Sequence, residues 1–119
     1  MKFATTIVIV IALTFNLLAQ NGLTGVWDTG DENTKIEFLQ KEEGSIYGKI
    51  LSSDAPKAKT GKILVKDVKF KNGGWTGKIY SAKKQKWYDA TFARKQDKLE
   101  VSISSGFFSK TLEWKRANS

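Results

Sequence analysis

Few residues of this 119-residue chain could carry out catalysis. The sequence contains no histidine and no cysteine, so the usual general base and the usual soft metal ligands are missing. A serine or threonine nucleophile needs a base beside it. Paired carboxylates could supply acid–base chemistry, but the two adjacent pairs, Asp31/Glu32 and Glu42/Glu43, fall in predicted turns, where carboxylates are solvated. We therefore expect no enzyme activity, no metal site and no cofactor.

Aromatic and basic side chains are the remaining candidates, and they point to binding. The chain has four tryptophans, and such rings can stack on an apolar or sugar ligand in a pocket. We predict ligand contacts at Trp75, Trp87 and Tyr88, with Lys84 and Lys86 attracting anionic groups at the rim. The alternative is that the tryptophans only fill the core of a small domain.

The first 19 residues predict export. Met1-Lys2 supplies a positive start, residues 3–18 are mostly apolar, and Ala19 offers a small residue at a cleavage position. This order is that of a signal peptide, and the apolar run is short for a membrane span. We expect cleavage after Ala19, a single domain over residues 20–119 with no transmembrane span, and a periplasmic or extracellular location.

Beyond the signal, the pattern predicts β-strands. Short runs alternate apolar and polar residues and are separated by Gly, Asn, Asp and Ser, which is typical of strands joined by turns. The predicted strands are Leu23–Thr29, Thr34–Gln40, Ser45–Leu51, Lys62–Phe70, Trp75–Ser81, Lys86–Arg94, Lys98–Ser104 and Phe107–Arg116. Eight consecutive strands with short turns favour an all-β, antiparallel, up-and-down barrel, with a two-sheet sandwich as the alternative.

The alternation also predicts which side chains face the interior. They are Ile36, Phe38, Ile46, Gly48, Ile50, Trp75, Gly77, Ile79, Tyr88, Ala90, Phe92, Leu99, Val101, Ile103, Phe108, Leu112 and Trp114. An eight-stranded barrel is either filled by side chains or holds one small ligand. The large residues favour a filled barrel, whereas Gly48, Gly77 and Ala90 favour some space, so both interiors stay open.

Two resemblances support this fold. Gly25-Val26-Trp27 resembles the Gly-x-Trp signature of the calycin superfamily, whose members include the lipocalins. That likeness implies that Trp27 closes one barrel end beneath Arg116, and that Gly25 and Trp114 belong to the same closure. The chain also resembles the bacterial exported proteins of domain of unknown function 2147. The shared landmarks are Gly25-Val26-Trp27, Tyr47-Gly48-Lys49-Ile50, Gly74-Trp75-Thr76-Gly77-Lys78-Ile79-Tyr80 and Trp114-Lys115-Arg116.

The resemblance implies a fold and an exported location, but no activity. The loop at 52–60 is shorter than in that family, and Ser81-Ala82-Lys83 replaces its Asp-Pro turn. We expect a non-enzymatic module of the cell envelope that binds a small apolar or amphipathic ligand at the barrel mouth.

The alternative function uses the unequal distribution of charge. The chain carries a net charge of +8, and most of its basic residues lie after Pro56. The lysine-rich strand, residues 62–71, could bind an anionic envelope lipid or glycan, or a protein partner. Basic residues beside aromatic ones can also bind nucleic acid, but export argues against that partner. The same lysines could serve solubility alone.

Overall fold

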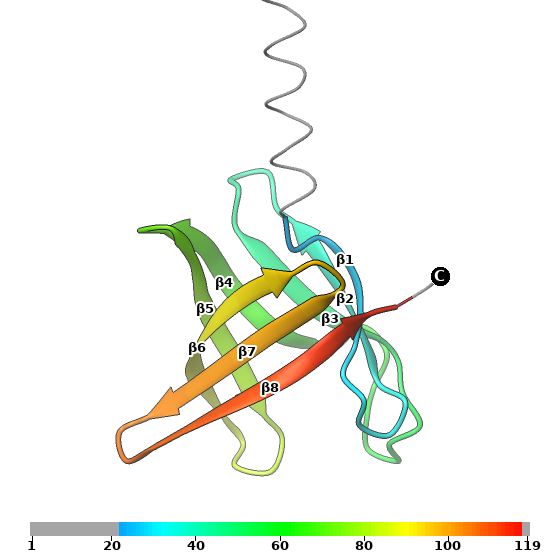
Figure 1. Ribbon diagram of the computed structural model, residues 1–119. Coiled ribbons are helices and arrows are strands. Elements are labelled where there is room, and N and C mark those ends of the chain that lie inside the picture. Colours follow the sequence, from blue (N-terminus) through cyan, green and yellow to red (C-terminus); the bar gives the residue numbers. More distant parts are fainter. Residues whose placement is uncertain (1–21, 118–119) are drawn as a thin grey trace, which may run out of the picture.

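The computed structural model describes residues 22–117, which form a closed antiparallel barrel of eight strands in sequence order. The predicted signal peptide, residues 1–19, lies outside the described residues. The strands are β1 (Gly25–Asp28), β2 (Lys35–Gln40), β3 (Ile46–Ser52), β4 (Ile63–Lys71), β5 (Gly74–Ser81), β6 (Lys86–Lys95), β7 (Lys98–Ser105) and β8 (Phe108–Arg116). The predicted barrel is confirmed, and each strand lies within about two residues of its predicted position (Figure 1). Within residues 22–117, no helix is long and apolar enough to cross a membrane.

Each strand pairs with its neighbours, but the seam between β1 and β8 is narrow. β6 pairs with β7 over seven positions from Asp89↔Ser104 to Lys95↔Lys98. Among the described residues, β1 and β8 pair only at Trp27↔Arg116 and Asp28↔Lys115, because β1 has only four residues. The C-terminal end of β8 is therefore paired with both β1 and β7, whereas its first part has only β7 as a described strand neighbour.

Outside β4, the core follows the predicted alternation. Its buried side chains include Trp27, Ile36, Phe38, Ile46, Ile50, Val65, Val68, Ile79, Ala90, Phe92, Leu99, Val101 and Trp114. The ring of Phe38 packs edge to face against Phe92 and Trp114, with centroids 6.1 and 6.2 Å away. Edge-to-face packing of this kind stabilises a core beyond the area that it buries.

One interior prediction was wrong. Phe108 has the inward parity of Leu112 and Trp114, but its side chain is 51% exposed. The β7–β8 hairpin continues past the end of the barrel wall, so Phe108 contacts Tyr88, with ring centroids 6.3 Å apart, rather than the core. Inward parity places a side chain inside only where the opposite wall reaches equally far.

The two interior glycines, whose small size favoured some space, do not leave it. A Cβ at Gly48 would lie 2.9 Å from Ile36 Cγ2 and 2.9 Å from Phe38 Cε1. A Cβ at Gly77 would lie 2.6 Å from Val68 Cγ2 and 2.9 Å from Val68 Cα. Neighbouring side chains and backbone fill both positions, so these glycines permit dense packing rather than a cavity.

A β-bulge in β4 explains the close approach at Gly77. The register between β4 and β5 shifts between Lys66 and Lys69, and Asp67 between them has a positive φ of 56°. The bulge brings both Val65 and Val68 into the core on either side of it. It also leaves the backbone of β4 close to position 77 of β5, so a side chain there would meet Val68.

Candidate functional site

The barrel has two chemically different ends. The turns β2–β3, β4–β5 and β6–β7 gather at the end where β8 finishes, and we call this the closed end. The turns β1–β2, β3–β4, β5–β6 and β7–β8 gather at the opposite, open end, which is the lower end in Figure 1. Because the strands run up and down, residues from distant parts of the sequence meet at each end.

The closed end is built around Trp27. Its indole Nε1 donates a hydrogen bond to Leu23 O at 2.9 Å. The Arg116 guanidinium lies over the ring at 4.8 Å from its centroid, and that of Arg94 lies at 5.6 Å. Arg116 also donates to Thr24 O at 3.0 Å. Burial lowers the pKa of Arg116, and the positive charge of Arg94 lowers it further. Two cations over one indole close this end of the barrel.

A cavity of about 450 Å³ occupies the open end. Its apolar floor consists of Ile36, Ile50, Leu64, Ile79, Leu112 and Trp114. Its rim is polar and is formed by Thr29, Asp31, Glu32, Thr34, Ser53, Lys57, Lys62, Tyr80 and Lys110, together with Ala55, Ala58 and Ala82. An apolar pocket with a few polar groups at its mouth is the usual form of a small-ligand site, and its volume falls within the usual range of about 300–1,000 Å³.

Two loops fix one side of the mouth. The β1–β2 turn and the β3–β4 loop lie side by side (Figure 1) and are joined by hydrogen bonds. Thr34 Oγ1 lies 2.6 Å from Ser53 Oγ, and Asp54 N donates to Glu32 O at 2.9 Å. These contacts connect two turns that are far apart in the sequence, so the mouth is organised before any ligand enters.

Lysines contribute most of the charge at the mouth. Lys57, Lys62 and Lys110 line the cavity, against the two carboxylates of Asp31 and Glu32. Lys62 Nζ lies 4.7 Å from the centroid of the Tyr80 ring, on the side of the wall where Tyr80 contacts Trp87. Three cations against two anions favour a ligand whose polar end is negatively charged.

The structure separates the residues predicted to bind a ligand, and none of the five lines the cavity. Trp75 pairs with Phe70 across the β4–β5 hairpin at the closed end, with ring centroids 5.1 Å apart. Trp87 lies on the outer face, where it contacts Tyr80 at 5.3 Å and Lys66 Nζ at 4.2 Å.

The other three members of the predicted set lie near the open end. Tyr88 packs partly against the core and contacts Lys86, whose Nζ is 5.0 Å from the ring centroid. Lys84 belongs to the exposed β5–β6 turn. Trp87 and Tyr88 are adjacent in one strand, so they point to opposite faces of the barrel wall.

Sequence reasoning missed the polar rim but had named most of the floor as interior. Five of the six floor residues have the predicted inward parity; the exception is Leu64, which lies where the register of β3 and β4 shifts. The sequence signal that could have located the cavity is the distance of each interior residue from the turns at the two ends of the barrel. Interior residues next to the turns at 29–34, 53–62 and 82–85 share the open end.

Comparison with known proteins assigns a family. A family model described as "Uncharacterized protein conserved in bacteria (DUF2147)" matches residues 25–116, which is the whole barrel from β1 to β8. The chain belongs to this family. No curated protein and no solved structure matches it. The matched range begins at Gly25 and ends at Arg116, the two residues that meet over Trp27. The part of the chain that matches the DUF2147 family therefore includes both the closed end and all the residues that line the cavity.

Proposed function

We propose that this DUF2147 protein is a non-enzymatic binding module of the cell envelope that holds a small apolar or amphipathic ligand. The observation that carries the proposal is the cavity of about 450 Å³ with its apolar floor at the open end. Transfer of an apolar group from water onto such a floor is favourable at roughly 25 cal/mol for each Å² buried. The proposal includes export, which would place the protein among lipids and glycans.

The rim selects the kind of ligand. An amphipathic molecule could bury its apolar part against Ile50, Leu112 and Trp114 while its anionic group stays at the mouth beside Lys62 and Lys110. The charges of these lysines are solvated, so they contribute to orientation and selectivity more than to affinity. A fatty acid anion has this division of polarity, and dodecanoate is a suitable probe.

Calorimetric titration with dodecanoate tests the proposal. Leu112→Trp would fill the floor, because Leu112 lines the cavity, and it should abolish binding. Thr111→Trp is the matched control, since Thr111 is the adjacent residue of β8 and faces outward beside Ser102. Both variants should first be shown to fold by circular dichroism and urea unfolding.

Binding of dodecanoate by the wild type and by T111W, but not by L112W, supports the proposal. Equal binding by L112W and T111W would show that the cavity is not the site. If no apolar or amphipathic probe binds to the wild type, the cavity function is refuted. The lysine-rich strand β4, with Lys66 held over Trp87 on the outer face, then becomes the better candidate for binding an anionic surface.

A further inference from the structure

The β7–β8 hairpin presents unpartnered aromatic rings at its tip. Phe107 is fully exposed, and Phe108 beside it is 51% exposed. Phe108 contacts Tyr88, which leaves the Phe107 ring as the outermost apolar group of the hairpin. The tip projects beyond the barrel wall, in orange at the lower left of Figure 1. The fully exposed Phe107 ring contributes nothing to the core, and together with the half-exposed Phe108 it leaves apolar surface at the tip that can contact a surface outside the chain.

Lysines lie on this aromatic tip and on the β5–β6 turn at the same end of the barrel. The β5–β6 turn with its following residue (82–86) and the β7–β8 tip (105–110) together carry Lys83, Lys84, Lys86 and Lys110, and the sequence has no acidic residue in either segment. Lys86 Nζ lies over Tyr88, and Tyr88 contacts Phe108, so the two turns form one continuous surface. We call it the cationic tip: residues 82–86 and 105–110.

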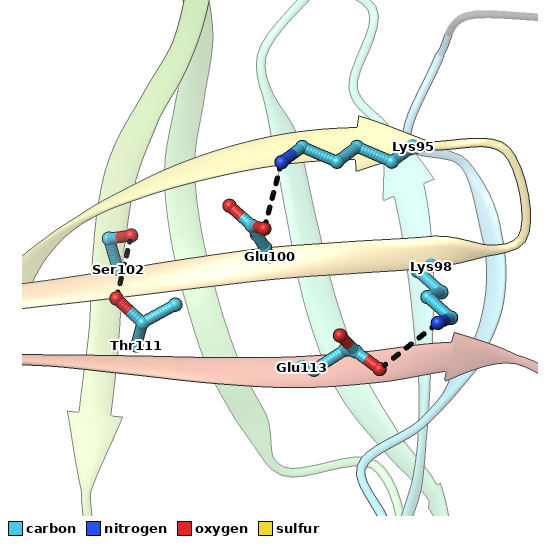
Figure 2. A network of polar contacts seen from close by, with 6 residues as sticks. All are labelled: Lys95, Lys98, Glu100, Ser102, Thr111 and Glu113. Carbon is cyan, nitrogen blue, oxygen red and sulfur yellow. Dashed lines mark hydrogen bonds and ion pairs between the residues drawn. The ribbon is translucent and has the colours of Figure 1, made fainter.

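On the outer wall, farther from the open end, some lysines are paired with carboxylates. Lys95 Nζ lies 2.9 Å from Glu100 Oε2, and Lys98 Nζ lies 3.7 Å from Glu113 Oε1, as Figure 2 shows. On the neighbouring strands, Lys78 Nζ pairs with Asp89 at 2.7 Å. These three lysines are therefore paired with carboxylates, whereas the cationic tip combines four lysines and no acidic residue with exposed aromatic rings.

From this combination we propose that the cationic tip docks the barrel onto an anionic lipid bilayer. The Phe107 ring inserts among the lipid headgroups and chains, and the four lysines lie near the phosphates. Aromatic insertion and attraction to a negatively charged surface are the two contributions that hold a protein at a bilayer interface. Neither needs a shaped groove, and the tip is a projecting hairpin.

Docking in this orientation turns the cavity toward the lipids. Ala82 and Lys110 belong both to the cationic tip and to the rim of the cavity. A bilayer against the tip would therefore lie close to the mouth, and an amphipathic ligand could pass between bilayer and cavity over a short path. Docking itself does not depend on a filled cavity, although the transfer rests on the proposed ligand binding.

Flotation with vesicles tests the docking. The whole chain is expressed, purified as the cell leaves it, and mixed with vesicles of phosphatidylglycerol and phosphatidylcholine or of phosphatidylcholine alone. We expect binding to the anionic vesicles only. Phe107→Ser should weaken it at least about tenfold, and Lys83→Gln with Lys84→Gln should weaken it by about fivefold for each lysine.

Phe70→Ser is the matched control, because Phe70 is 59% exposed on the β4–β5 hairpin at the closed end. Lys71→Gln with Lys115→Gln removes the same charge as the lysine pair, from exposed positions at that end. Both controls should bind like the wild type. Loss of binding in F70S with none in F107S, or equal binding by all variants, overturns the proposal.

A site-specific probe gives an independent answer. Because the chain has no cysteine, Phe107→Cys and Phe70→Cys each provide a single attachment site for an environment-sensitive fluorophore. The label at position 107 should shift to the blue on anionic vesicles and be quenched by lipids carrying a nitroxide, and the label at position 70 should not change. A label at position 107 that stays in water overturns docking. The cavity variant L112W should still bind vesicles, so failure of the ligand site and failure of docking can be told apart.

Discussion

At the scale of single residues, the closed end depends on a guanidinium over an indole. Arg116 lies 4.8 Å from the centroid of Trp27 and donates to Thr24 O. Arg116→Ala removes this contact together with the packing of the aliphatic stem, so we expect the free energy of unfolding to fall by about 1 kcal/mol. Urea unfolding measures it. An R116A protein as stable as the wild type would contradict a structural role for the stack.

Gly25 belongs to the same closure. Its φ is +120°, and a Cβ there would lie 2.5 Å from Arg116 Nη1. Two features thus favour glycine at the first position of the Gly-x-Trp pattern. Its backbone conformation suits glycine, and the Arg116 guanidinium occupies the space that a side chain would need. The resemblance to a known signature could mark this residue, but only the structure connects it with Arg116.

Gly77 offers a sharp test of packing at the bulge. Gly77→Ala places a methyl group 2.6 Å from Val68 Cγ2 and 3.0 Å from Lys66 O, and overpacking of this kind costs about 1–3 kcal/mol. Gly74→Ala in the same strand is the control, because nothing lies within 4 Å of its Cβ position. Thermal unfolding should place G77A well below the wild type and G74A close to it. Equal melting temperatures for the two variants would mean that β4 can relax away from β5.

One carboxylate should make stability depend on pH. Ser45 Oγ donates to Glu43 Oε1 at 2.6 Å, and this hydrogen bond lowers the pKa of Glu43 below its ordinary value of 4.5, with Lys41 and Lys69 acting in the same direction. A folded-state pKa below the unfolded one adds stability at pH values above the unfolded pKa. That contribution disappears as the pH falls through the folded-state pKa.

The measurement compares the wild type with Ser45→Ala. A carbon-detected NMR titration should show the pKa of Glu43 rising toward its ordinary value in S45A. The stability difference that depends on Glu43 should be complete near neutral pH and should shrink as the pH falls below about 4.5. If the stability difference between the wild type and S45A is the same near neutral pH and well below pH 4.5, the effect of Ser45 comes from its buried position and not from its hydrogen bond to Glu43.

At the scale of the elements, the sequence predicted which segments are strands better than it predicted their contacts. Alternation and turn residues were sufficient for eight strands, because each hairpin is local and each strand has one apolar face. The bulge at Asp67 was not predicted, since an aspartate with a positive φ inside a strand depends on the neighbouring strand. For the same reason, Gly77 counted only as an argument for some interior space, whereas the shifted β4 backbone occupies its position.

In the candidate site too, the sequence predicted the strands and the inward-facing residues but not the contacts between distant segments. Parity identified Ile36, Ile50 and Ile79 as interior, but did not separate the cavity from the filled half of the barrel. Trp75 was predicted to contact a ligand because it is a large aromatic, yet it is the second residue of β5 and lies in the closed-end hairpin. The rim could not be predicted, because its residues come from turns whose relative position depends on hydrogen bonds such as Asp54 N to Glu32 O.

The short seam between β1 and β8 predicts uneven protection along β8. Among the described residues, pairing with β1 covers only Lys115 and Arg116, whereas pairing with β7 runs from Lys98↔Lys115 to Ser105↔Phe108. Amides between Phe108 and Trp114 that point away from β7 should exchange with solvent faster than those that point toward it. Hydrogen exchange measured by NMR would show this alternation. Uniform protection along β8 would mean that another segment covers the seam.

At the scale of the whole molecule, the two ends have separate roles. The closed end is dense, with two guanidiniums over Trp27 and the Phe70–Trp75 pair on the adjacent hairpin. The open end combines the cavity, the lysines of its rim and the cationic tip. The hydrogen-bonded wall of the closed barrel connects them, so the orientation of the barrel on a surface also decides where the cavity opens.

Salt should separate the two binding events proposed for the open end. Ligand binding buries apolar surface against the cavity floor, and the lysines of the rim add only a solvated, weak contribution. Docking on a bilayer depends on four lysines at a charged surface, and such attraction is screened over roughly 8–10 Å at physiological ionic strength. We therefore expect vesicle binding to fall steeply between low and physiological salt, while dodecanoate affinity changes little. Vesicle binding and dodecanoate binding should be measured in the same buffers for the wild type, F107S and L112W. A loss in F107S is then assigned to the cationic tip, and a loss in L112W to the cavity. If dodecanoate binding falls as steeply as vesicle binding, the rim lysines rather than the apolar floor hold the ligand, and the proposed cavity function is wrong.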